Sequence, residues 1–231
     1  MGDKAGICIS IADKDSKRAL SLARRESAQA DILEIRLDYL DKPVISPFVG
    51  ELELPLIFTC RPKWEGGEFA GSEKERADLL EEAIASGAAY VDIELKSDEK
   101  MRQRIIEEAK LNKVKSIVSW HDFRTTPSAQ ALESIFQEQY RTGADVGKIV
   151  TMAQGFQDVL RVLDLQVMAA EMGFPLCAFC MGRTGMISRI ASLELGGYMS
   201  YAAPDEGGVT APGQLPASEM HSILKCFHGK I

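Results

Sequence analysis

The chain has 231 residues, of which 45% are hydrophobic and 26% are charged, and this composition is ordinary for a soluble globular protein. The formal net charge of −7 argues against nucleic acid or an anionic membrane surface as a partner, although it allows a locally basic pocket for a small anionic substrate. No apolar run approaches the roughly 18 residues of a membrane span, so we expect no membrane association.

The cysteines and the N-terminal segment predict a cytoplasmic protein. The first residues lack the apolar core of a secretory signal peptide. Five scattered cysteines, an odd number, are typical of reduced thiols. Cys177 and Cys180 have CxxC spacing, but a strand would place their thiols on opposite faces, and no second pair completes a zinc site. We therefore expect no metal and no cofactor.

Strand-like apolar runs alternate with helical patterns along the chain. The expected strands cover residues 6–11, 31–38, 54–60, 88–95, 115–121, 143–153, 175–180 and 196–201. A helix should begin at Asp13 or Asp15, whereas Pro43 and Pro47 should break the chain after the second strand. Later helices are expected from the capping box of Ser72 to residue 87, from a Ser97 cap to about residue 112, and over 128–143, 157–172, 185–195 and 218 onward. Residues 181–185 should form a loop.

Eight strand-then-helix units require a parallel sheet. Their number and the chain length favour a single (β/α)8 TIM barrel that spans residues 1–231 as one domain. A doubly wound open sheet is the alternative. No glycine-rich nucleotide-binding motif follows any expected strand, which weakens the nucleotide-binding form of that alternative.

Ionisable residues recur on one face of several expected strands. Glu34 and Arg36 alternate with apolar residues in the second strand, as Asp92 and Glu94 do in the fourth. Both faces of a parallel barrel are covered, so these charges should converge inside its C-terminal mouth, where barrel enzymes carry their chemistry. A purely structural charge network is the alternative. The converging set would be Lys148, His121, Glu34, Arg36, Arg61, Asp92, Glu94 and, from a loop, Glu65.

Lys148 stands alone in an otherwise apolar strand, between Val146 and Val150 on one face. A charged lysine is costly to bury, and a neutral one forms Schiff bases with carbonyl groups. Neighbouring cations would favour the neutral form. The alternative is a structural lysine that reaches water or pairs with a carboxylate. Together with His121, which can move protons near neutral pH, the lysine predicts imine formation and proton abstraction. The arginines indicate an anionic, carboxylate-bearing substrate.

Six motifs in the chain resemble type I 3-dehydroquinate dehydratase. They span nearly the whole chain in the order of that family: residues 34–38 (EIRLD), 59–61 with 65–68 (TCR, EGGE), 119–123 (SWHDF), 146–148 (VGK), 181–189 (MGRTGMISR) and 211–214 (APGQ). The resemblance implies a (β/α)8 barrel that eliminates water from 3-dehydroquinate to give 3-dehydroshikimate, the third step of the shikimate pathway. It also implies a homodimer.

The resemblance further implies roles for individual residues. Lys148 would form the imine with the C3 ketone, and His121 would be the base at C2 and then the acid for the C1 hydroxyl. Glu65 would orient His121, although Glu94 is an alternative partner. The substrate-binding residues would be Glu34, Arg36, Arg61, Arg189 for the carboxylate, Gln214 and Thr210 in the last loop, and Ser10.

Two other readings are open. A class I aldolase also uses a barrel lysine, but it would need phosphate-binding glycine loops after the seventh and eighth strands. Gly182 and the pair Gly207 and Gly208 offer only a faint version of such loops. A non-catalytic barrel that binds a carboxylate metabolite is the other possibility, and the presence of both Lys148 and His121 argues against it.

Overall fold

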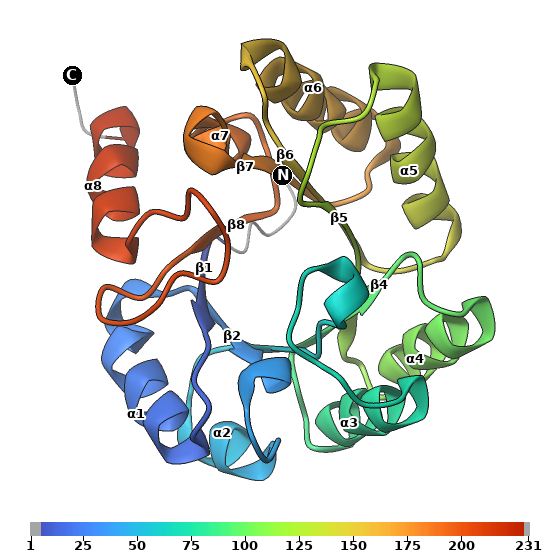
Figure 1. Ribbon diagram of the computed structural model, residues 1–231, viewed down its shortest axis with the longest axis vertical. Coiled ribbons are helices and arrows are strands. Elements are labelled where there is room, and N and C mark those ends of the chain that lie inside the picture. The colour runs from blue at the N-terminus through green and yellow to red at the C-terminus, as the bar shows by residue number, and fades with distance from the viewer. Residues whose placement is uncertain (1–5, 229–231) are drawn as a thin grey trace.

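Eight parallel strands form a nearly closed barrel with helices around it in the computed structural model, which describes residues 6–228 (Figure 1). The strands are β1 (Gly6–Ile11), β2 (Ile32–Arg36), β3 (Leu56–Thr59), β4 (Tyr90–Glu94), β5 (Lys115–Asp122), β6 (Val146–Met152), β7 (Leu176–Met181) and β8 (Met199–Ala202). The helices are α1 (Ser16–Glu26), α2 (Ser46–Glu51), α3 (Glu73–Ala85), α4 (Glu99–Leu111), α5 (Ala129–Arg141), α6 (Phe156–Met172), α7 (Gly182–Glu194) and α8 (Ala217–His228).

The strand order confirms the predicted (β/α)8 barrel rather than an open doubly wound sheet. Consecutive strands pair in parallel from β1 to β7, and β8 pairs with β1. The ring is completed where the backbone N–H of Tyr198 donates to the carbonyl of Leu176 at 2.9 Å. Within residues 6–228 we find no helix with the length and apolar character needed to cross a membrane.

Most predicted elements are confirmed, and three details of the prediction are wrong. The capping box of Ser72 and Glu75 opens α3 as expected. However, residues 181–185 are not a loop, because α7 begins at Gly182, directly after β7. Pro47 does not only break the chain but lies in the first turn of α2, where its missing N–H costs nothing. Asp98, not Ser97, caps α4.

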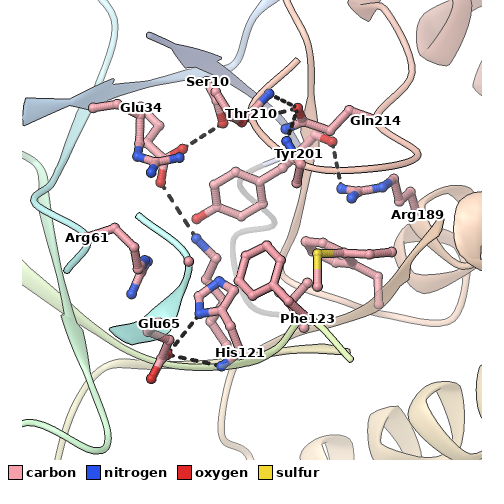
Figure 2. A pocket seen from close by; sticks show the side chains of 17 residues that line it. Ser10, Glu34, Arg61, Glu65, His121, Phe123, Arg189, Tyr201, Thr210 and Gln214 are labelled. Atoms are coloured by element: carbon pink, nitrogen blue, oxygen red, sulfur yellow. Dashed lines mark hydrogen bonds and ion pairs between the residues drawn. The ribbon is translucent and has the colours of Figure 1, made fainter. Parts of the chain in front are cut away.

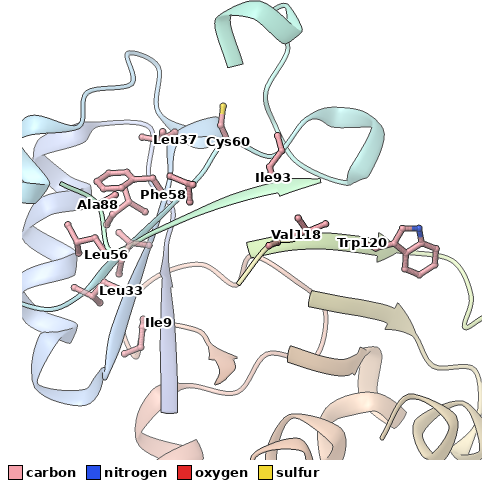
Figure 3. Packing of buried hydrophobic residues seen from close by; sticks show 14 of the residues in the cluster. Ile9, Leu33, Leu37, Leu56, Phe58, Cys60, Ala88, Ile93, Val118 and Trp120 are labelled. Carbon is pink, nitrogen blue, oxygen red and sulfur yellow. The ribbon is translucent and has the colours of Figure 1, made fainter. Parts of the chain in front are cut away.

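The outer faces of the strands carry the larger apolar layer. Leu33, Phe58 and Val118 are fully buried between the strands and the helices, and Figure 3 shows this part of the layer. Cys180 belongs to this outer layer, whereas Cys177 belongs to the barrel interior, so the two thiols lie on opposite faces as predicted. The helices thus cover one face of every strand and leave the other face for the barrel interior.

The barrel interior changes from apolar to polar along the strands. Its apolar part is formed by Cys8, Ile32, Ile57, Tyr90, Ile117, Val146, Cys177 and Met199, one residue from each strand. The next inward residue of each strand lies two positions further on, because side chains alternate between the faces. These residues are Ser10, Glu34, Thr59, Asp92, Ser119, Lys148, Phe179 and Tyr201, and most of them are polar. An apolar floor therefore lies beneath a ring of functional groups.

The close contact between α7 and β7 depends on Gly185. A Cβ atom at this position would lie 2.6 Å from the carbonyl carbon of Cys180. Gly50 in α2 has open space around it, with no atom within 4 Å of such a Cβ. Both glycines lie in helices, but only at Gly185 does the packing leave no room for a side chain.

We predict that Gly185→Ala lowers the free energy of unfolding by about 1–3 kcal/mol, because α7 must move away from β7. Gly50→Ala should instead be neutral or stabilise by up to about 1 kcal/mol, because it reduces the freedom of the unfolded chain. Urea unfolding curves of both variants test this. If both variants unfold at the same urea concentration, α7 can move away from β7 without loss of stability, and the prediction is wrong.

Candidate active site

One pocket at the C-terminal ends of the strands is lined by all ten residues to which the family resemblance assigned roles (Figure 2). Asp92 and Glu94, which were also expected in the converging set, are buried and contact Arg61. The pocket encloses ≈ 460 Å³ of space that atoms do not fill, part of it open to solvent, a size that suits a small metabolite. The ten are Ser10, Glu34, Arg36, Arg61, Glu65, His121, Lys148, Arg189, Thr210 and Gln214. Their convergence follows from the barrel, while the roles expected of them stay predictions.

Lys148 is buried in β6, with only 4% of its surface exposed. Its Nζ lies 3.1 Å from Oδ2 of Asp92 and 3.6 Å from Oε1 of Glu34. The ring centroid of Tyr201 lies 3.9 Å from the same nitrogen. Two carboxylates therefore contact the amine directly, which is the contact that the structural alternative for Lys148 predicted. The cations expected near it, Arg36 and Arg61, are themselves paired with carboxylates. The lysine does not reach water, and its charge is balanced inside the barrel.

Arg61 holds the carboxylate that contacts Lys148. Its guanidinium donates to Asp92 at 2.8 Å, to Glu94 at 2.6 Å and to the hydroxyl of Ser119 at 2.5 Å. Burial alone would raise the pKa of Asp92, but the charges of Arg61 and Lys148 outweigh it and hold this pKa well below its usual range. Asp92 is therefore a fixed anion and a very weak base.

His121 is paired with Glu65, which answers the question of its partner. Oε1 of Glu65 lies 3.0 Å from the imidazole Nδ1 and accepts the backbone N–H of His121 at 3.0 Å. Glu94 is instead engaged by Arg61 and by Arg76. Because Oε1 already accepts a backbone N–H, we assign the Nδ1–H tautomer, which leaves Nε2 free to accept a proton.

The environment of this pair favours uncharged forms. Burial, followed by the charges of Arg61 and Lys148, lowers the pKa of His121 well below 6.5. Burial raises the pKa of Glu65 to about 8. The loop that presents Glu65 turns at Gly66, whose φ of 79° is left-handed. A Cβ there would overlap the Phe123 ring, which stacks on His121 with 6.1 Å between ring centroids.

Glu34 and Arg36 do not satisfy each other by direct hydrogen bonds. Glu34 accepts the hydroxyls of Ser10 at 2.6 Å and Thr59 at 2.8 Å. Arg36 makes two hydrogen bonds to Asp38, at 2.9 and 2.7 Å. Burial would raise the pKa of Glu34, but the charges of Lys148 and Arg36 outweigh it and lower the pKa. Glu34 is thus an ionised acceptor at the edge of the pocket.

Arg189 lies on the other side of the pocket, as Figure 2 shows. It is 1% exposed, yet no carboxylate among the described residues pairs with it. Its guanidinium donates to the carbonyls of Tyr201 at 3.2 Å and Pro212 at 3.5 Å, and its Nε has no hydrogen-bond partner among these residues. Burial lowers its pKa to about 10. A buried cation without an anion is costly, so this end of the pocket suits an anionic ligand.

The last loop brings Gln214 and Thr210 to the same end. Oε1 of Gln214 accepts the backbone N–H and the hydroxyl of Thr210, at 2.7 and 3.1 Å, and the N–H of Ala211 at 3.1 Å. These bonds fix the side-chain amide of Gln214 at the pocket wall. The Arg189 guanidinium donates to the carbonyl of Pro212 in the same loop, so Gln214 and Arg189 line the same end of the pocket.

Sequence reasoning did not nominate several residues that line the pocket. These are the apolar or aromatic residues Phe123, Val150, Phe179, Met181 and Tyr201. Asp92 was expected in the barrel mouth, but its direct contact with Lys148 was not predicted. The signal that could have found Tyr201 and Phe179 is the two-residue alternation, continued through the seventh and eighth strands. In the described part of the chain, no group of three or more His, Cys, Asp or Glu side chains could hold a metal ion.

Comparisons with known proteins agree with this geometry. The family model described as type I 3-dehydroquinase matches residues 7–231. A 3-dehydroquinate dehydratase of Desulfotalea psychrophila is 46% identical over 94% of this chain and 96% of that protein. The crystal structure of the enzyme of that name from Geobacillus kaustophilus has a TM-score of 0.89 at 28% identity, covering 96% of this chain and 91% of the other.

A type I 3-dehydroquinate dehydratase from Clostridium difficile, solved with covalently modified comenic acid, also has a TM-score of 0.89. It is 29% identical, and the match covers 99% of this chain and 94% of the other. The chain therefore belongs to the type I 3-dehydroquinase family.

Proposed function

We propose that this protein is a 3-dehydroquinate dehydratase, a hydro-lyase that forms 3-dehydroshikimate in the shikimate pathway through an imine on Lys148. The observation that carries the proposal is that one pocket contains both a buried lysine and a buried arginine with no carboxylate partner within residues 6–228. The substrate has a ketone for the first group and a carboxylate for the second. Membership of the family supports the same substrate.

The charges in the pocket orient such a substrate. Of the four cationic side chains that line it, Arg36, Arg61 and Lys148 already contact carboxylates of the protein. The substrate carboxylate therefore binds Arg189, with Gln214 and Thr210 beside it. The ketone then faces Lys148, and the ring hydroxyls face Glu34 and Arg36.

Imine formation requires Lys148 to lose a proton before it attacks the C3 carbonyl. Asp92 is too weak a base to accept it, because Arg61 stabilises its anionic form. His121 is neutral and has a free Nε2, so it takes this proton and passes it to the carbonyl oxygen after the attack. It then carries a second proton from the attached nitrogen to the same oxygen, which leaves as water. The product is an iminium ion between Lys148 and C3.

The iminium then acts as an electron sink for the elimination. His121 removes a proton from C2, the electron pair moves into the C–N system, and the C1 hydroxyl leaves with the proton that His121 carries. Water then hydrolyses the imine, which frees 3-dehydroshikimate and Lys148. The net change is the loss of one water molecule from the substrate, and Glu65 keeps the imidazole in the required tautomer.

Borohydride trapping tests the imine directly. With 3-dehydroquinate and borohydride, mass spectrometry of peptides should find the reduced adduct on Lys148. Lys148→Met should abolish the adduct and lower kcat by about 10⁴-fold or more, because the nucleophile is lost. The exposed Lys100→Met serves as the control and should behave as the unchanged protein.

Other outcomes of the trapping experiment exclude the proposal. An adduct on another lysine would remove Lys148 as the nucleophile. Dehydration without an adduct would require an imine-free elimination. No reaction with 3-dehydroquinate would favour the class I aldolase or a barrel that only binds a carboxylate.

The lowered pKa of His121 predicts the pH dependence of activity. Because its pKa lies below 6.5, the imidazole stays neutral as the pH falls through 6.5. The value of kcat/KM should therefore stay level there and decrease only at lower pH. A pH profile measured from about pH 5 to 9 checks this, and a break at 6.5 itself would contradict the assignment of His121 as a buried, neutral base.

Two variants of Glu65 separate its hydrogen bond from its charge. Glu65→Gln keeps the Oε1 acceptor for Nδ1–H and should retain activity within about 10-fold, since burial already favours the protonated acid. Glu65→Leu removes the acceptor and should cost about 10²-fold. Equal losses in both variants would show that a negative charge on Glu65 is required.

The reduced state of the thiols supports a cytoplasmic location, which we also propose. All five cysteines are free, and four of them are buried. Burial raises the pKa of the Cys60 and Cys177 thiols, in the latter to about 12, so they are unreactive toward oxidation at neutral pH.

An exposed apolar stripe on α6 and α7 supports a homodimer. Phe156, Leu160 and Val167 follow one face of α6 and are 73%, 66% and 59% exposed, and Ile187 on the neighbouring α7 is 57% exposed. A groove along α7, between the start of α6 and α8, is lined mostly by apolar side chains, among them Phe156, Ile187 and Ile223. Clustered apolar surface of this kind is typical of an interface between subunits.

We predict that the double variant Leu160→Asp, Ile187→Asp is monomeric where the unchanged protein is a dimer, because it places charges in the buried contact. Light scattering after size-exclusion chromatography measures the mass. Leu111→Asp, at a 79% exposed position on α4, is the control. A dimer that survives the double substitution would place the interface elsewhere.

A further inference from the structure

The aromatic ring of Tyr201 lies against the reacting nitrogen of Lys148. We propose that this ring stabilises the positive charge on that nitrogen through the imine stage of the reaction, and so acts as a catalytic group in its own right. The inference rests on the proposed imine mechanism and adds to it a residue that the sequence did not nominate.

Three groups surround the Lys148 nitrogen. Asp92 and Glu34 contact it at 3.1 and 3.6 Å, and the ring centroid of Tyr201 lies 3.9 Å away. Tyr201 is 3% exposed and belongs to β8, on the inward face next to the pocket. Figure 2 shows its ring in the middle of the site, between Glu34 and Arg189. A buried cation on an aromatic face is attracted to the ring more strongly than an exposed one.

The three contacts change differently when the imine forms. An ammonium has three N–H groups and can donate to both carboxylates, whereas a protonated imine has a single N–H and can donate to only one of them at a time. The attraction of the ring depends on the charge and its position over the face, not on an N–H group. The ring therefore favours the protonated iminium over the neutral imine, and only the protonated form draws electrons from C2.

The aromatic wall continues from Tyr201 to the other cation of the pocket. The rings of Tyr201 and Phe179 lie 5.9 Å apart, and the guanidinium carbon of Arg189 lies 4.6 Å from the Phe179 ring centroid. Both ends of the pocket thus present a cation on an aromatic face. The same wall keeps water from the two charges, which strengthens their interactions with a substrate.

The ring, and not the phenol group, carries the proposed effect. The hydroxyl of Tyr201 is buried and has no hydrogen-bond partner among the described residues. Burial raises the pKa of Tyr201 well above its ordinary value, so the hydroxyl keeps its proton. A phenylalanine would present the same face to Lys148 without a buried unpaired polar group. Tyr201→Phe is therefore a matched variant that keeps the ring.

Two substitutions separate the ring from the space that it fills. Tyr201→Phe should keep kcat within about 3-fold, whereas Tyr201→Leu should lower kcat by about 10–30-fold, the factor that a desolvated cation–π contact supplies. The alkaline limb of the pH profile should move to lower pH in Tyr201→Leu only, because the cationic nitrogen is less stable without the ring. Losses of equal size in both variants would assign the effect to the hydroxyl and overturn the proposal.

A fluorinated series tests the same idea in a protein that keeps its shape. Phenylalanine with an increasing number of ring fluorines, placed at position 201, has a progressively weaker negative face. The value of kcat should fall stepwise along the series while circular dichroism and the midpoint of urea unfolding stay constant. A kcat that does not change with fluorination overturns the proposal.

Trapping with borohydride in the same samples separates the two proposals. An adduct on Lys148 together with a kcat that is insensitive to fluorination would reject the role of Tyr201 and leave the imine mechanism intact. The absence of any Lys148 adduct in the unchanged protein would reject the mechanism itself.

Discussion

The burial of one lysine amine inside a barrel is the constraint on which the rest of the site depends. Lys148 is 4% exposed, and a charged group at this depth must be balanced. Asp92 supplies the direct counter-charge and is held in turn by Arg61, which also contacts Glu94. Each charge in the barrel therefore requires the next, and the chain of ion pairs continues outside the strands through Arg76 to Glu73, both in α3. The helical layer thus takes part in positioning the amine.

This arrangement leaves one buried base in a neutral form. The same cations that stabilise Asp92 disfavour a proton on His121. Lys148 and Arg61 therefore make one neighbour a fixed anion and the other a neutral acceptor, although both groups lie in the same pocket. The different protonation states of Asp92 and His121 thus follow from burial and from the charges and hydrogen bonds of neighbouring side chains.

The alternation of residues in the strands explains how much of this could be predicted. Parity placed Glu34, His121 and Lys148 on the inner face, and eight β/α units indicated the barrel, so the convergence of the pocket followed from the sequence. The contacts between these side chains could not be predicted from the sequence. The alternation shows which face of a strand a residue lies on, but not how far it is from residues of other strands. Strand register and side-chain reach decide that Asp92, rather than an arginine, contacts the amine. Tyr201 was not predicted as a site residue, because Gly196 and Gly197 weaken the strand pattern of the last strand.

The position of Arg189 makes the two ends of the pocket different in charge. Arg36, Arg61 and Lys148 are paired with carboxylates of the protein, whereas the contacts of Arg189 in the described part of the chain are carbonyl groups and an aromatic face. A second anion near Arg189 would have made the empty pocket more stable, but it would also have removed the preference for an anionic ligand. A substrate with one carboxylate and one ketone can satisfy Arg189 in a single orientation only. In the proposed reaction, the unfavourable burial of Arg189 in the free protein is thus what would bring the ketone, and not another carbon, to Lys148.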